Sequence, residues 1–144
     1  MKASNQPPNW VQEHTNRYIE SNGEDGHIWN QVPTLLLTTT GRHTGRLITT
    51  PLIYGKDDNR YFVVASRGGS HDHPNWYLNL DAQPTVKVQV LASKFDAKAH
   101  TATNNEKSHI WSIMTKIWPA YDDYQSKTTR IIPIVILEPI TSSV

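Results

Sequence analysis

The chain of 144 residues contains no cysteine, and this absence excludes a disulfide framework, a thiolate metal site and a cysteine nucleophile. It also carries little net charge, +1 at pH 7, so no overall field would recruit nucleic acid or anionic lipid. No stretch approaches the roughly 20 apolar residues that a membrane-spanning helix needs. What is present, 37% hydrophobic and 19% charged residues, is typical of one folded domain.

The first residues of the sequence lack the apolar core of a signal peptide, so we predict a cytoplasmic protein. Residues 1–144 are expected to form a single domain, with residues 1–8 as a loose N-terminal arm. A first helix over 8–21 has some apolar side chains, namely Trp10, Val11, Tyr18 and Ile19. It has no basic cluster, so we expect at most weak peripheral membrane contact.

Six segments have the β-branched, apolar or alternating composition of strands, over 32–40, 47–54, 60–66, 85–90, 94–103 and 131–138. Further helices are expected over 74–80, 106–118 and 121–127, and a loop over 24–30. Pro51 suggests an edge strand or a bulge, and Pro133 a bulge. Hairpins join most strands, so we predict a mainly β, α+β fold. It would be a six-stranded antiparallel barrel with three or four short helices on its rim.

The predicted hairpin tip Gly41–Arg46 gathers two arginines, a histidine and a threonine between two glycines. Guanidinium groups, a hydroxyl and glycine amides together suit a phosphate or a carboxylate. A basic turn that faces only solvent would have the same composition. The tip is therefore a candidate anion site, with a solvated loop as the alternative.

A second basic glycine segment, ASRGGS over 65–70, follows a predicted strand and precedes a predicted helix. Glycines let a ligand approach the backbone closely, and free amides at the start of a helix attract anions. The alternative is a flexible loop before a capped helix. Both basic segments follow strands, so they can meet at one end of a barrel.

A row of aromatic residues at a spacing of three, Trp118, Tyr121 and Tyr124, would share one face of a helix. Such a row can line the site of a planar ligand and direct hydroxyls at its oxygens. Plain core packing is the alternative.

Other catalytic signatures are missing. His71 and His73 have a spacing that can chelate, but no third ligand is evident, so we predict no metal site. The sequence has no Gly-x-Ser-x-Gly elbow, no Walker phosphate loop and no Gly-x-Gly-x-x-Gly fingerprint. No base is fixed beside Ser66 or Ser70, which disfavours a hydrolase.

The chain resembles the deazaflavin-dependent nitroreductase family, also described as coenzyme F420H2-dependent quinone or nitro reductases. The resemblance rests on five motifs in one order, GRHTG, TPL, VVASRGGSHDHPNWYLNL, AQPTVKVQV and WPAYDDYQSKTTRIIPIVILEP, between about Leu35 and Pro139. It implies a split β-barrel of the flavin-reductase type that binds coenzyme F420. It also implies an oxidoreductase that transfers hydride from the reduced cofactor to an electron-poor small molecule, such as a quinone or a nitro compound.

The resemblance also implies roles for single residues. The cofactor would be held by Arg42, His43, Thr44, Gly45, Pro51, Ser66, Arg67, Gly68, Gly69, Trp76 and Asn79. The acceptor would be lined by Ile53, Trp118, Tyr121 and Tyr124. The catalytic hydroxyls would be those of Ser66, Tyr121 and Tyr124, which would bond the acceptor oxygen as negative charge develops on it.

Four positions depart from the family pattern. His43 stands where lysine is common, Ile48 where arginine is common, and Ile53 and Trp118 where close relatives have tyrosine. Two hydroxyls are therefore missing from the acceptor side.

Alternatives remain open at this point. The same barrel could serve an FMN-dependent oxidoreductase, or a non-catalytic protein that binds the deazaflavin without turning it over. Nucleic-acid binding is disfavoured because no basic stripe is present. Relatives with this barrel are often dimeric, which allows a homodimer.

Overall fold

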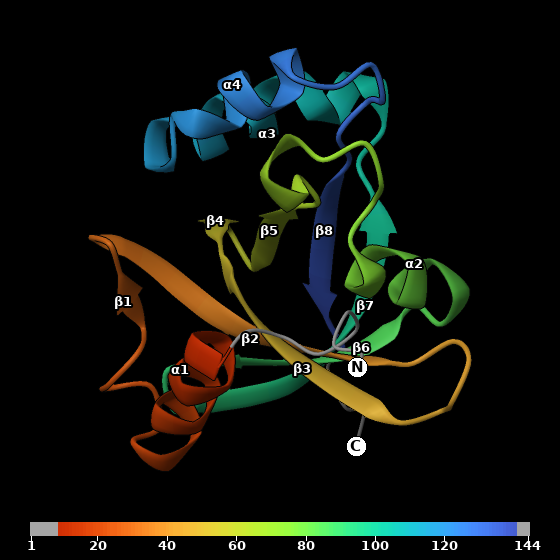
Figure 1. Ribbon diagram of the computed structural model, residues 1–144. Coiled ribbons are helices and arrows are strands. Elements are labelled where there is room, and N and C mark those ends of the chain that lie inside the picture. Colours follow the sequence, from red (N-terminus) through yellow and green to blue (C-terminus); the bar gives the residue numbers. More distant parts are fainter. Residues whose placement is uncertain (1–8, 141–144) are drawn as a thin grey trace.

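A computed structural model describes residues 9–140 as one antiparallel eight-stranded sheet, curled into a half-barrel with four α-helices around it (Figure 1). The strands are β1 (Ile28–Trp29), β2 (Val32–Thr40), β3 (Leu47–Ile53), β4 (Gly55–Asp57), β5 (Arg60–Val64), β6 (Thr85–Val90), β7 (Ser93–Thr101) and β8 (Ile134–Pro139). The helices are α1 (Asn9–Glu20), α2 (Asn75–Ala82), α3 (Asn104–Ile117) and α4 (Ala120–Ser126), with a single 3₁₀ turn η1 (Arg67–Gly69). The arm predicted over residues 1–8 lies outside the described residues.

The structure confirms the antiparallel split barrel and corrects its details. It has eight strands rather than six, because β1 lies in the expected loop and β4 is a further short strand between the segments predicted over 47–54 and 60–66. These strands have two and three residues, too few to show an alternating pattern. The last strand begins at Ile134 rather than Ile131. Pro133 has no N–H for a ladder, and its carbonyl instead accepts a hydrogen bond from the Ala65 N–H at 2.9 Å.

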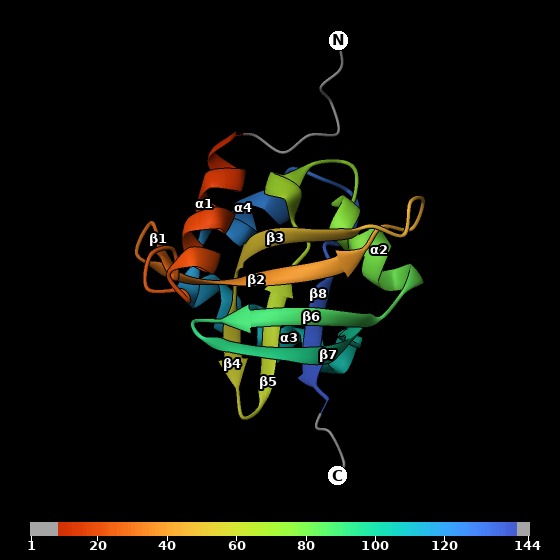
Figure 2. The same ribbon diagram turned by 90° about the horizontal axis from the view of Figure 1, so that it is seen from below.

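The strand order explains why the barrel stays open. Along the sheet the order is β1-β2-β6-β7-β8-β5-β4, and β3 pairs with β2 alone. Figure 2 shows β3, β2, β6 and β7 crossing in front of β5 and β8. Pro51 is accommodated because β3 is an edge strand. Within residues 9–140 no ladder joins β3 to β5, so a gap in the backbone hydrogen bonding remains between them.

Two cores lie on the two faces of β5 and β8, because successive side chains of a strand point to opposite sides. Val63 and Val135 face the barrel interior, whereas Phe62 and Ile136 face α3. Full burial of one such side chain stabilises the fold by about 1.5–3 kcal/mol. The nearly continuous apolar sequence of β8 therefore serves both cores, and it fixes α3 and α4 over one face of the sheet.

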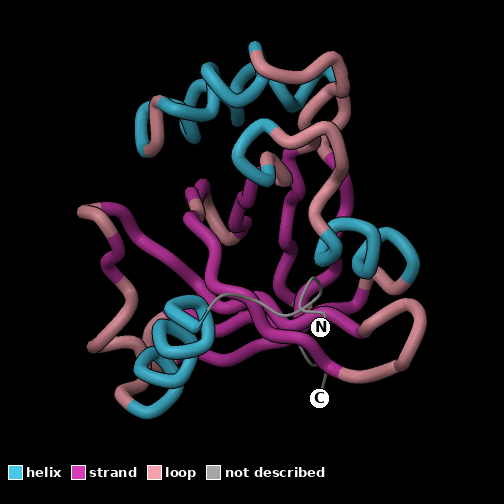
Figure 3. Tube along the Cα trace, viewed as in Figure 1, coloured by secondary structure: helices cyan, strands magenta, loops and turns pink. Residues whose placement is uncertain are grey.

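The helices begin and end within two residues of the predicted positions, and local chemistry accounts for their ends. Thr103 and Glu106 form a reciprocal capping box at the start of α3, and Pro119 separates α3 from α4. Figure 3 shows these two helices together on one side of the sheet and α2 on another. In α1, Tyr18 is fully buried and donates its hydroxyl hydrogen to the Thr34 carbonyl at 3.0 Å. The Tyr18 side chain is therefore not available to a membrane, whereas Ile19 is exposed. The Trp10 side chain lies outside the described part of the chain.

Candidate active site

A cavity of about 310 Å³ lies at the gap between β3 and β5, with α4 on one side of it. Its volume is at the lower end of the range for small-molecule sites. Nine of its lining residues belong to the predicted site: Pro51, Ile53, Ser66, Arg67, Gly68, Trp76, Trp118, Tyr121 and Tyr124. The gap thus gathers residues from β3, the segment after β5, α2 and α4.

A larger hollow of about 540 Å³ lies elsewhere on the sheet and contains none of the predicted residues. Its polar groups include Lys87 and Asp96, which form an exposed ion pair at 3.3 Å. Exposed pairs of this kind contribute little energy and no chemistry. The smaller cavity is therefore the candidate active site.

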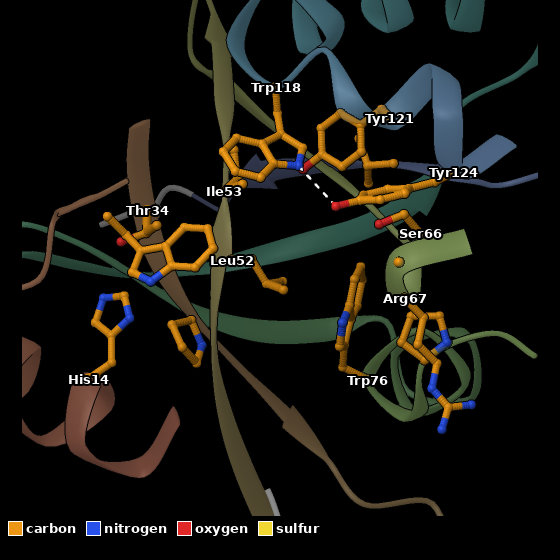
Figure 4. A pocket seen from close by; sticks show the side chains of 15 residues that line it. His14, Thr34, Leu52, Ile53, Ser66, Arg67, Trp76, Trp118, Tyr121 and Tyr124 are labelled. Atoms are coloured by element: carbon orange, nitrogen blue, oxygen red, sulfur yellow. Dashed lines mark hydrogen bonds between the residues drawn. The ribbon is translucent and has the colours of Figure 1, made fainter. Parts of the chain in front are cut away.

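The segment 65–70, here named the glycine segment, forms one wall of the cavity (Figure 4). Ser66 is only 8% exposed, and its hydroxyl makes no capping bond to the turn that follows. Arg67, Gly68 and Gly69 all have positive φ, at 45°, 62° and 83°. A Cβ on Gly68 would meet nothing within 4 Å, so a ligand can approach the backbone there.

Gly69 has a different role from its neighbour. It is buried beneath α4, and a Cβ there would come within 2.8 Å of the Tyr124 carbonyl oxygen and 3.0 Å of the Tyr124 Cα. It does not line the cavity. Gly69 therefore permits the close contact between the glycine segment and α4.

The aromatic residues Trp118, Tyr121 and Tyr124 form a second wall, which adjoins the glycine segment at Tyr124 and lies in the upper part of Figure 4. The Trp118 indole N–H donates to the Tyr124 hydroxyl oxygen at 3.3 Å. The Tyr124 hydroxyl hydrogen thus remains available for a second acceptor. Trp29, from the short strand β1, extends this wall, with its ring 5.7 Å from that of Trp118.

Tyr121 belongs to the core and to the cavity at once. Its side chain is 5% exposed and packs in the core against α3, with its ring 6.0 Å from that of Tyr124. Burial, with a smaller contribution from Tyr124, raises the pKa of the Tyr121 phenol well above its usual value. The hydroxyl therefore stays protonated and can act only as a hydrogen-bonding group.

The hairpin tip 41–46 lies beside α2 rather than in the cavity (Figures 1 and 2). The Arg42 guanidinium donates to Asn79 Oδ1 at 2.8 Å, and the Arg42 backbone N–H donates to the same oxygen at 3.1 Å. Two predicted cofactor residues are thus in contact, outside the cavity lining. His43, Thr44 and Gly45 are exposed. A ligand that touches both segments must extend out of the cavity past α2.

Six lining residues were not predicted: His14, Trp29, Thr34, Leu52, Val64 and Pro74. The His14 Nε2 bonds the Gly26 carbonyl at 2.7 Å, so this nitrogen carries the hydrogen. His14 lies in the helix predicted over 8–21, but no local pattern indicates that α1 packs on β3. Trp29 fell in a segment expected to be a loop.

The described residues also bear on metals and membranes. Among residues 9–140 no group of three or more His, Asp or Glu side chains is arranged to hold a metal ion. His73 instead accepts a hydrogen bond from Arg130 at 3.0 Å. No helix in this part of the chain has both the length and the apolar character required to cross a membrane.

Comparison with known proteins identifies close relatives. The family described as F420H(2)-dependent quinone reductase matches residues 10–139. A Mycobacterium tuberculosis protein named F420H(2)-dependent quinone reductase is 39% identical over 124 residues, which cover 83% of each chain. A solved structure of an F420-H2 dependent reductase is 39% identical, with a TM-score of 0.69 over 74% of this chain and 94% of that one. Another, described as a domain-swapped dimer, is 38% identical, with a TM-score of 0.72 over 92% and 100% of the two chains.

Proposed function

The chain belongs to the F420H2-dependent quinone reductase family, and from this we propose that it transfers hydride from reduced coenzyme F420 to a quinone. One observation carries the proposal: a single cavity brings the glycine segment beside an aromatic wall that carries hydroxyl groups. A nitro compound is a second electron-poor acceptor of the same kind.

The residues present fit a deazaflavin. The cavity is lined mostly by aromatic and aliphatic groups, which suit a flat ring, and Gly68 leaves open space beside its backbone. Arg42, His43 and Arg67 are exposed at one side and suit an anionic tail. When bound, the reduced cofactor supplies the hydride, and the protein supplies binding, orientation and electrostatics.

In this proposal the hairpin tip holds the tail and the glycine segment holds the ring. Arg42, His43 and Arg67 would neutralise the tail, while the Thr44 hydroxyl and the Gly68 amide would add neutral hydrogen bonds. The Gly45 and Gly69 amides already donate to the Gly41 and Ser66 carbonyls, so these glycines would contribute only through backbone shape. Asn79 is 3% exposed and already accepts two hydrogen bonds from Arg42. It would therefore act by orienting Arg42, and Trp76 and Pro51 would bound the ring.

The acceptor would lie against Ile53 and Trp118, with its oxygen toward Ser66 and Tyr124. Hydride addition leaves negative charge on that oxygen, and one added proton completes the hydroquinone. Hydroxyls that donate to the developing charge lower the barrier. Tyr124 keeps its own hydrogen for this purpose, because it accepts from Trp118. The proton comes from a tyrosine hydroxyl or from water, and Tyr121 supports the oxygen without ionising.

Parallel titrations with F420 and FMN test the cofactor. We expect F420 to bind much more tightly than FMN. The reverse order would replace the proposal with an FMN-dependent oxidoreductase on the same barrel. Tight F420 binding without oxidation of F420H2 by any quinone or nitro compound would instead indicate a non-catalytic deazaflavin-binding protein.

We also propose that the chain forms a homodimer, and that it is a cytoplasmic protein. The dimer is supported by the 38% identical relative whose structure is described as a domain-swapped dimer. Light scattering on the purified protein should give twice the mass of the 16.4 kDa chain. A single-chain mass at all accessible concentrations would contradict the dimer and leave the enzymatic proposal intact.

A further inference from the structure

Arg130 lies outside the cavity, in the segment between α4 and β8, yet its side chain reaches the glycine segment. Its Nε donates to the Ser70 carbonyl at 2.8 Å, and its Nη2 donates to the Ser66 carbonyl at 2.8 Å. Its Nη1 donates to the Ala65 carbonyl at 3.2 Å and to His73 Nδ1 at 3.0 Å. One guanidinium thus binds both ends of the glycine segment.

The glycine segment has a backbone that needs such support. Arg67, Gly68 and Gly69 are consecutive left-handed residues, and a non-glycine residue in that region costs roughly 1–2 kcal/mol. Inside the segment only two backbone hydrogen bonds form, from the Gly69 N–H to Ser66 and from the Ser70 N–H to Arg67. Strained conformations of this kind persist when the surrounding structure fixes them.

The backbone of Arg130 is itself tied to α4. The Gln125 side chain donates to the Arg130 carbonyl at 2.8 Å and accepts from the Ile132 N–H at 3.0 Å. Gln125 follows Tyr124 directly, and Tyr124 is the residue that covers Gly69. Arg130 therefore connects the two walls of the cavity, the glycine segment and α4.

We propose that Arg130 is a positioning residue that holds the glycine segment against α4 and so keeps the cofactor wall formed before the ligand binds. The part of this inference that names F420 as ligand rests on the proposed function, whereas the part on the segment's conformation does not. Without the guanidinium, the segment occupies other conformations for part of the time. The apparent dissociation constant for the ligand then rises, because it equals the intrinsic constant divided by the fraction of protein in the binding conformation. Saturating ligand restores that conformation.

The first test measures the segment directly, without cofactor. Amide hydrogen exchange is followed in the wild type, in Arg130→Gln and in the control Arg60→Lys, which alters an arginine that pairs with Glu106 at 3.9 Å outside the cavity. We expect the Gly69 and Ser70 amides to exchange about tenfold faster in Arg130→Gln, with β5, β8 and the control unchanged. Unchanged exchange in the segment, or equal acceleration throughout β5 and β8, would overturn the proposal.

The second test separates positioning from general stability. At a temperature well below melting, Arg130→Gln should raise the F420 dissociation constant about tenfold and change kcat at saturating F420 less than threefold. Arg130→Lys keeps the positive charge but loses the branched guanidinium donors. Its F420 dissociation constant should lie between those of the wild type and Arg130→Gln. Wild-type affinity in a folded Arg130→Gln protein would overturn the inference. If the wild type itself fails to bind F420, the proposed function fails, and hydrogen exchange still decides the role of Arg130.

Discussion

The hairpin tip and the glycine segment have similar sequences, each with glycines and arginine after a strand, but the structure gives them opposite surroundings. Residues 42–46 of the tip are exposed, and a Cβ on Gly45 would meet nothing within 4 Å. The glycine segment is bonded by Arg130 and packed under α4, where a Cβ on Gly69 would meet the Tyr124 backbone at 2.8 Å. The hairpin tip can therefore supply positive charge to a ligand and tolerate an added side chain at Gly45. The glycine segment supplies a fixed backbone shape and does not tolerate an added side chain at Gly69.

The largest expected effect comes from one substitution made in both places. Gly69→Ala adds a Cβ against the Tyr124 backbone in a left-handed residue, so the free energy of unfolding should fall by about 3 kcal/mol or more. Gly45→Ala also places a side chain on a left-handed residue, at φ +74°, but the added Cβ meets open space. The free energy of unfolding should therefore fall by only about 1 kcal/mol. Urea unfolding measures both. Equal losses would remove the contrast between the two segments.

Next in size is the loss of charge at the tip. Arg42→Ala should weaken F420 binding by about 1.5–3 kcal/mol, the usual range for a charged hydrogen bond, or roughly 10- to 150-fold. The loss should shrink as ionic strength rises, because the side chain is exposed. The free energy of unfolding should change much less than in Gly69→Ala. F420 affinity equal to that of the wild type would take the tip out of the site.

The aromatic wall offers a matched pair. Tyr124→Phe removes a hydroxyl that can donate to the acceptor, so kcat/KM for a quinone should fall about tenfold, equivalent to about 1.4 kcal/mol. F420 affinity should barely change. Tyr121→Phe affects a residue that is 5% exposed and should alter melting temperature more than turnover. Lower stability with intact turnover in both variants would make both tyrosines core residues only.

The smallest expected effect is a pH dependence at His73, a half-buried residue in ring contact with Tyr77. Burial and then the Arg130 guanidinium lower the pKa of His73, against the opposing pull of Asp72 and Asp81. The neutral ring accepts from Arg130, so its contribution is complete above about pH 6.5 and is lost as pH falls through the lowered pKa.

His73→Asn keeps an acceptor that does not titrate. Between pH 7 and pH 5 the wild type should therefore lose a measurable amount of unfolding free energy relative to this variant, up to about 1 kcal/mol. Urea unfolding at several pH values measures the difference. Parallel stability curves for the two proteins would show that His73 contributes nothing through its titration.

Much of the fold was predictable, because it depends on local periodicity. The composition of residues 131–138 indicated a strand, which β8 is from Ile134 onward. Pro51 indicated an edge strand or a bulge, and β3 is an edge strand. Nine of the site residues predicted from the motifs line one cavity. What remained hidden depends on contacts between distant segments. Arg130 bonds carbonyls about 60 residues earlier in the chain, and no local pattern identifies a guanidinium's partners at that separation.

The positions of His14 and Trp29 were hidden for the same reason. They reach the cavity only because α1 packs on β3 and β1 pairs with β2, and neither has a sequence signature for that packing. Residues that form a site through tertiary packing rather than through a motif are therefore the ones that sequence analysis missed here.

The oxidation of F420H2 by a quinone tests the central claim most directly. Purified protein is mixed with F420H2, and the return of F420 absorbance is followed as the quinone concentration is raised. We expect a rate that saturates with quinone concentration, depends on enzyme concentration and falls about tenfold in Tyr124→Phe. F420H2 that is bound but stays reduced with every quinone and nitro compound would contradict it.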